Sequence, residues 1–129
     1  DRIKAVNDFY DAGYDVHLNY SPIIVYDDFT NGYTELFKLV DNIVDNSIKD
    51  KVKAECIFLT HNKKMHQHNL SNNTKGEEYL WNPDYQENKT SEYGGKNIRY
   101  NRFYKNKCIT AFKHIHKEQI NWQEIRYIF

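Results

Sequence analysis

Apolar residues recur along the chain at two periods, and the change between them predicts helices that alternate with strands. Residues 2–12 and 27–48 repeat apolar side chains at the spacing of one helical face. Residues 14–24 alternate apolar and polar side chains, and residues 52–60 form a run of β-branched and apolar residues, as strands do. Helix, strand, helix, strand is the order of an α/β protein built on a parallel sheet.

The second half of the chain has weaker patterns, which predict a hairpin between helical and polar segments. Residues 61–70 are typical of a helix, residues 71–88 of a polar loop, and residues 89–104 of a β-hairpin. Residues 106–119 return to roughly helical spacing, and residues 122–129 alternate as a terminal strand that closes a sheet edge. A single domain is expected, because 129 residues support one hydrophobic core comfortably and two poorly.

A glycine pair in the stretch "SEYGGKNIRY", residues 91–100, predicts the turn of this hairpin. Glycine reaches positive φ without a steric penalty, so the pair suits a tight reversal of the chain. The tip is then expected to carry aromatic and basic side chains, namely Tyr93, Lys96, Arg99 and Tyr100. These side chains could stack on bases and contact phosphates, or they could form an ordinary solvated edge.

The charges are balanced overall but unevenly distributed along the chain. Residues 1–50 hold 10 acidic and 4 basic residues, whereas residues 51–129 hold 8 acidic and 14 basic residues. Within residues 87–117 there are eight basic residues against Glu87 and Glu92. This stretch indicates either a surface for an anionic partner such as DNA or a solvated face of no special function.

Cysteine content and hydropathy favour a cytoplasmic protein with no membrane-spanning segment. Cys56 and Cys108 are too few for a disulfide framework, and no run of 18 apolar residues occurs. The chain also begins without methionine, within the first predicted helix, and lacks the apolar core of a signal peptide. We therefore expect a segment of a larger protein.

Five histidines suggest a metal site at first sight: His61, His66, His68, His114 and His116. Metal ligands on one helix are typically three or four residues apart, whereas these include two pairs only two residues apart. The spacing therefore predicts solvated or capping roles and no metal site. Asp27 and Asp28 could cap the helix that follows them or bind a sugar hydroxyl, and the pattern favours capping.

Three stretches in this order and spacing resemble the C-terminal third of the spore photoproduct lyase family of radical S-adenosylmethionine proteins. They are "AGYDVHLNYSPIIVYDDFTNGYTELF" (residues 12–37), "KTSEYGGKNIRY" (residues 89–100) and "WQEIRYIF" (residues 122–129). The resemblance implies an α/β fold, a partial (β/α) barrel of parallel strands and helices over residues 1–60. A C-terminal extension over residues 61–129 would carry the hairpin, a helix and the terminal strand.

The resemblance also implies a chemistry for the parent protein. In the family, a loop of the form Cys-x-x-x-Cys-x-x-Cys holds a [4Fe-4S] cluster, which cleaves S-adenosylmethionine reductively to a radical that reverses a thymine dimer in DNA. This chain lacks that loop, because Cys56 and Cys108 are 52 positions apart. The chain alone is therefore expected to be inactive, and to supply a wall of the cofactor pocket, a DNA-facing hairpin and contacts to the rest of the barrel.

Individual residues follow from the same resemblance. Tyr20, Ser21 and Ile23 stand at the end of a strand that faces S-adenosylmethionine in the family, although a plain core strand explains them as well. The hairpin residues that match or flank family positions are expected to bind the substrate: Tyr93, Lys96, Arg99 and Tyr100. Residues 87–92 lack the family's Arg and Trp, which leaves the substrate open. The alternative is a non-enzymatic nucleic-acid-binding or structural domain.

Overall fold

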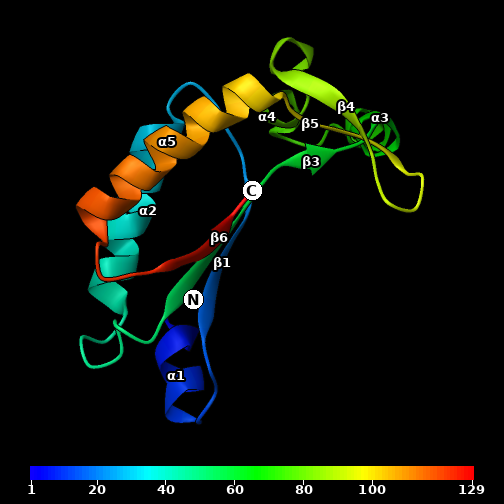
Figure 1. Ribbon diagram of the computed structural model, residues 1–129. Coiled ribbons are helices and arrows are strands. Elements are labelled where there is room, and N and C mark those ends of the chain that lie inside the picture. Colours follow the sequence, from blue (N-terminus) through cyan, green and yellow to red (C-terminus); the bar gives the residue numbers. More distant parts are fainter.

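The computed structural model describes residues 1–129 and contains two three-stranded sheets (Figure 1). The first sheet comprises β1 (His17–Ile23), β2 (Lys53–Phe58) and β6 (Ile125–Ile128) in the order β1-β2-β6. Both of its strand pairs are parallel. The predicted parallel sheet and terminal strand are therefore confirmed, and β6 forms the edge beside β2.

The helices that precede β2 and β6 lie on the same face of this sheet. α2 (Phe29–Ile43) connects β1 to β2, and α5 (Arg102–Gln119) leads into β6. The two helices run side by side along the sheet (Figure 1). Successive parallel strands with their helices on one face form the wall of a (β/α) barrel, whereas a doubly wound sheet places helices on both faces. The predicted class, a partial (β/α) barrel, is confirmed.

The side chains of β1 show that one face of the sheet is buried and the other is exposed. Tyr20 and Ile23 are buried toward the helices, whereas Asn19 and Ser21 are exposed on the opposite face. Parallel sheets are normally covered on both faces. The exposed face is the one that a complete barrel would turn toward its interior.

An aromatic cluster fixes the helices to the sheet. Phe37 of α2 and Phe112 of α5 are both 0% exposed, and their ring centroids lie 5.3 Å apart in an edge-to-face arrangement. The ring centroid of Tyr20 in β1 lies 5.5 Å from that of Phe37, and the ring centroid of Phe58 in β2 lies 6.2 Å from that of Phe112. Such aromatic pairs add a specific geometry to the burial of their apolar area.

The second sheet contains the predicted hairpin and one strand that the sequence did not predict. Its order is β3 (Thr60–His61), β5 (Lys96–Tyr100) and β4 (Gln86–Thr90), and both pairs are antiparallel. β3 follows β2 directly, with only Leu59 between them. Within residues 61–129, α5 and β6 return to the first sheet.

Three helices complete the chain. α1 (Ala5–Asp11) lies at the end of the sheet where β1 begins (Figure 1). α3 (Lys63–Ser71) confirms the predicted helix over residues 61–70. The segment predicted as a polar loop contains α4 (Glu77–Leu80) and a short 3-10 turn. None of the helices combines the length and the apolar character needed to cross a membrane.

Removal of one core ring tests this packing. Phe112→Ala is expected to lower the free energy of unfolding by about 3–5 kcal/mol, because it empties a site that touches both α2 and the strands. Phe103→Ala is the matched control, since Phe103 lies in the same helix and is 85% exposed. Its effect should stay within about 0.5 kcal/mol in urea denaturation. Equal effects of the two substitutions would contradict the packing described above.

Candidate functional site

The hairpin turn is a five-residue loop, residues 91–95, in which Gly94 takes a backbone conformation that favours glycine. The Ser91 N–H donates to the Gly95 carbonyl at 2.8 Å, and the Gly94 N–H donates to the Ser91 carbonyl at 2.9 Å. Gly94 has φ +79°, and a Cβ on Gly95 would lie 2.8 Å from Ser91 Oγ. A side chain at Gly94 would therefore strain the turn, and one at Gly95 would displace the Ser91 hydroxyl.

Two of the expected hairpin residues are exposed at the tip, and a third is engaged in an ion pair. The tip projects away from the rest of the chain (Figure 1). Tyr93 is 96% exposed, and Lys96 is exposed as well. Arg99 lies nearer the base, where its Nε donates to Glu87 Oε1 at 2.9 Å. Tyr93 and Lys96 therefore face solvent, while the charge of Arg99 is partly neutralised.

Tyr100 does not lie at the tip, and this expectation was wrong. The residue is 3% exposed, and its hydroxyl accepts a hydrogen bond from the Val25 N–H at 2.9 Å. Burial raises the pKa of Tyr100 above its ordinary value, although the same hydrogen bond opposes the rise. Tyr100 therefore ties the end of β5 to the segment that follows β1, and its side chain is not available to a substrate.

Positive charge gathers instead along the hairpin, from Lys89 near the turn to Lys105 in the first turn of α5. The pKa of Lys105 is lowered, first by partial burial and then by repulsion from Arg99 and Lys89. Arg102 lines the same surface hollow as Arg99 and Lys105. We call Lys89, Arg99, Arg102 and Lys105 the cationic patch. It combines the two hairpin strands with the first turn of α5.

Two of the three remaining basic residues of α5 lie away from this surface. Lys113 and Lys117 lie 8 and 12 residues beyond Lys105 in the same helix. At 1.5 Å per residue they are about 12 and 18 Å further along its axis. Salt screens exposed charges beyond about 10 Å. The basic stretch over residues 87–117 is therefore divided between two parts of the molecule.

A hollow of about 420 Å³ lies beside the hairpin, next to the cationic patch. Lys63 and Lys96 contribute to its lining, together with the indole of Trp81. The Trp81 ring stacks on the imidazole of His66, with centroids 4.2 Å apart and an interplanar angle of 9°. Trp81 therefore connects this hollow to a cluster of polar side chains behind it.

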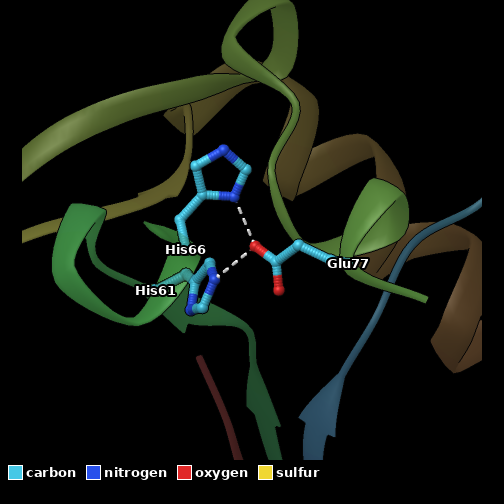
Figure 2. Close-up of side chains that lie close together, drawn as sticks. All are labelled: His61, His66 and Glu77. Carbon is cyan, nitrogen blue, oxygen red and sulfur yellow. Dashed lines mark hydrogen bonds and ion pairs between the residues drawn. The ribbon is translucent and has the colours of Figure 1, made fainter. Parts of the chain in front are cut away.

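This cluster consists of two histidines around one buried carboxylate (Figure 2). His61 Nε2 lies 2.9 Å and His66 Nδ1 lies 2.5 Å from Glu77 Oε1. Asn69 Nδ2 donates to the other oxygen, Oε2, at 2.5 Å. The side chains of His61 and Glu77 are 9% and 4% exposed. Solvated roles were therefore the wrong prediction for His61 and His66.

Burial and hydrogen bonds act in opposite directions on the pKa of the Glu77 carboxyl group. Burial by itself would raise its pKa, but the hydrogen bonds from His66, Asn69 and His61 outweigh burial and lower the pKa below its ordinary value. The three partners come from β3 and α3, whereas Glu77 opens α4. Nothing in the local sequence marks this carboxylate, because it lies 16 and 11 positions after the two histidines.

The residues expected to face a cofactor lie on opposite sides of β1. Tyr20 is 8% exposed and donates its hydroxyl hydrogen bond to Gln123 Oε1 at 3.0 Å, within the core. Ile23 is 0% exposed. Of these three residues, only Ser21 presents its side chain on the exposed face of the sheet. Cofactor binding stays a prediction that the Ser21 side chain and the neighbouring backbone can satisfy.

The two cysteines do not fit an iron–sulfur cluster. Cys56 of β2 and Cys108 of α5 are 0% and 4% exposed within the hydrophobic core. Burial raises the pKa of the Cys56 thiol to about 12, and burial also raises that of Cys108. Cluster ligands are thiolates, whereas burial keeps these two groups as thiols. This chain therefore contributes no ligand set for such a cluster.

Comparisons with known proteins define the family. The fold is a segment of (β/α) barrel wall that carries a hairpin sheet. The family model described as spore photoproduct lyase matches residues 1–129. The chain therefore belongs to the spore photoproduct lyase family. Among curated protein sequences, a search found no match.

Solved structures of spore photoproduct lyase share the fold. One variant with bound AdoMet and dinucleoside spore photoproduct superposes with a TM-score of 0.82 at 16% identity, over 99% of this chain and 37% of the lyase. A second structure, complexed with dinucleoside spore photoproduct, superposes with a TM-score of 0.78 at 17% identity. The match covers 99% of this chain and 37% of that lyase. This chain thus spans about 37% of the length of these lyases.

Tyr100→Phe separates a structural role from substrate binding. The substitution leaves the buried Val25 N–H without its acceptor, so we expect the free energy of unfolding to fall by about 1–3 kcal/mol. DNA affinity of the folded protein should not change. Tyr93→Phe is the control, and its effect on unfolding should be under about 0.5 kcal/mol. A Tyr100→Phe protein of unchanged stability and reduced DNA affinity would restore Tyr100 as a substrate contact.

Proposed function

We propose that this chain is the C-terminal part of a radical S-adenosylmethionine lyase that acts on a photoproduct in DNA, and that the hairpin and the cationic patch hold the DNA. The proposal rests on family membership together with one observation. Cations that repel one another gather along a projecting hairpin and the first turn of α5. Solved lyases of the family are described with a dinucleoside photoproduct bound.

Phosphate groups match the cationic patch chemically. Lys89 and Lys105 form no ion pair, and they repel each other in the free protein. An anion placed between them relieves that repulsion and gains two charge-assisted contacts. Tyr93, exposed at the tip, offers an aromatic face on which an unpaired base can stack. Proteins that bind nucleic acid usually contact the phosphate backbone with one set of residues and the nucleobases with another.

The exposed face of the first sheet is the proposed cofactor side. Asn19 and Ser21 provide polar side chains there, toward the end of β1 where ligands of (β/α) barrels bind. S-adenosylmethionine, when bound to a cluster held outside this chain, would supply the adenosyl radical. The role of this chain is to close that side of the cofactor pocket, exclude water and position the DNA.

A salt titration of DNA binding tests the proposal. In the full-length protein that contains these residues, Lys96→Ala/Lys105→Ala removes one unpaired cation from the tip and one from the base. Each lost phosphate contact reduces the slope of log affinity against log salt by about one, so the slope should fall by about two. Fluorescence anisotropy with duplex DNA at several salt concentrations measures both affinity and slope.

Lys113→Ala/Lys117→Ala is the matched control for this titration. It removes the same charge from the same helix, but at the end remote from the hairpin. Its slope should equal that of the unmodified protein, and both double variants should melt at the same temperature as the unmodified protein. If the two double variants weaken DNA binding equally, or if neither does, the cationic patch is not the DNA surface.

A further inference from the structure

We propose that His61, His66 and Glu77 form a binding site for a divalent metal ion, with Zn²⁺ as the ion that the ligands favour. Figure 2 shows both imidazoles directed at the same oxygen of the carboxylate. The three candidate ligand atoms all lie within 4.8 Å of one another. This site is separate from the cationic patch, so its test does not depend on DNA binding.

The donor atoms have the chemistry of a zinc site. Two imidazole nitrogens and one carboxylate oxygen are a ligand set that zinc uses in proteins, with a water or external ligand at the fourth position. A buried carboxylate also needs a positive partner. No Lys or Arg pairs with Glu77, and its partners in ion-pair range are His61 and His66. A cation among these three groups would meet that need with the histidines neutral.

The spacing of the ligand atoms suits a metal after a small adjustment. Bonds of about 2.0–2.1 Å in a tetrahedron place neighbouring ligand atoms about 3.4 Å apart. The two nitrogens now lie 2.9 and 2.5 Å from Glu77 Oε1. Separation by less than about 1 Å therefore makes room for the ion, which rotation of the side chains can provide. The side chain of His66 is 19% exposed, which leaves a path for the ion and for a water ligand.

Neighbouring side chains already hold these ligands in place. Asn69 donates to Glu77 Oε2 and so leaves Oε1 as the oxygen directed at the histidines. Trp81 stacks on His66 and meets the ring of His61 edge-on, with centroids 6.1 Å apart. Such outer partners are characteristic of metal sites, because they fix the orientation of the ligands. The ion would fasten α3 and α4 to β3, the strand that supports the hairpin.

Zinc content and thermal stability test the site. The full-length protein is equilibrated with Zn²⁺, desalted and analysed for metal, and its melting temperature is recorded with and without Zn²⁺. His66→Gln and Glu77→Gln should each bind about one zinc ion per chain less than the unmodified protein. The Zn²⁺-dependent rise in melting temperature, which reports binding to the folded state, should shrink in both variants.

His68→Gln is the matched control, because His68 lies in the same helix two residues from His66 and is exposed. It should retain both the zinc ion and the rise in melting temperature. Circular dichroism establishes that each variant is folded, and either folded variant suffices for the comparison. Equal zinc content and equal temperature shifts in the unmodified protein, His66→Gln and His68→Gln would overturn the proposal. The cluster would then be a hydrogen-bonded link only.

Discussion

The direct connection between β2 and β3 determines how the two sheets, and with them the rest of the molecule, are arranged. β2 leaves the parallel sheet and becomes β3 of the hairpin sheet after a single residue, Leu59. Leu59 is 6% exposed, and its N–H donates to the Ile23 carbonyl at 3.0 Å. With so short a connection, the hairpin sheet has little freedom to rotate against the barrel wall. The orientation of the hairpin is thus set by the core.

A second connection fixes the base of the hairpin from the other side. The Tyr100 hydroxyl binds the Val25 N–H, and the Asn101 N–H donates to the Tyr85 carbonyl at 2.8 Å. Asn101 also caps α5, since its side chain accepts from the Tyr104 N–H at 2.9 Å. β5 therefore passes straight into the first turn of α5. This junction brings cations of both elements onto one surface before any ligand is bound, which reduces the ordering that binding requires.

The periodic patterns were sufficient to predict the large elements. Phe37 and Phe112 recur at helical spacing with their neighbours, and both helices include these patterns, although α5 begins four residues before the predicted helix and α2 ends at Ile43. β3 was missed because two residues are too few to show a period. Alternation along β1 and β5 indicates that neighbours face opposite sides, but not which side is buried. Tyr100 was therefore placed at the tip when it belongs to the core.

Local sequence patterns could not predict the candidate metal cluster for a similar reason. His61 and His66 lie on either side of a strand-to-helix boundary, so helical spacing does not apply to them. Their carboxylate partner arrives from α4 only when the intervening segment folds back. Spacing rules detect ligands within one element, whereas this cluster depends on tertiary structure. The family resemblance, in contrast, rested on the order of three stretches and was confirmed over residues 1–129.

Hydrogen exchange in the native state tests most directly whether the hairpin is built into the barrel wall. The account predicts that amides in residues 59–61 and 96–100 are protected to nearly the same degree as those of β2, because a single residue joins β2 to β3 and the two sheets open together. Residues 91–95 at the turn should exchange rapidly. Rapid exchange throughout residues 96–100, with β2 still protected, would contradict a hairpin fixed by the core.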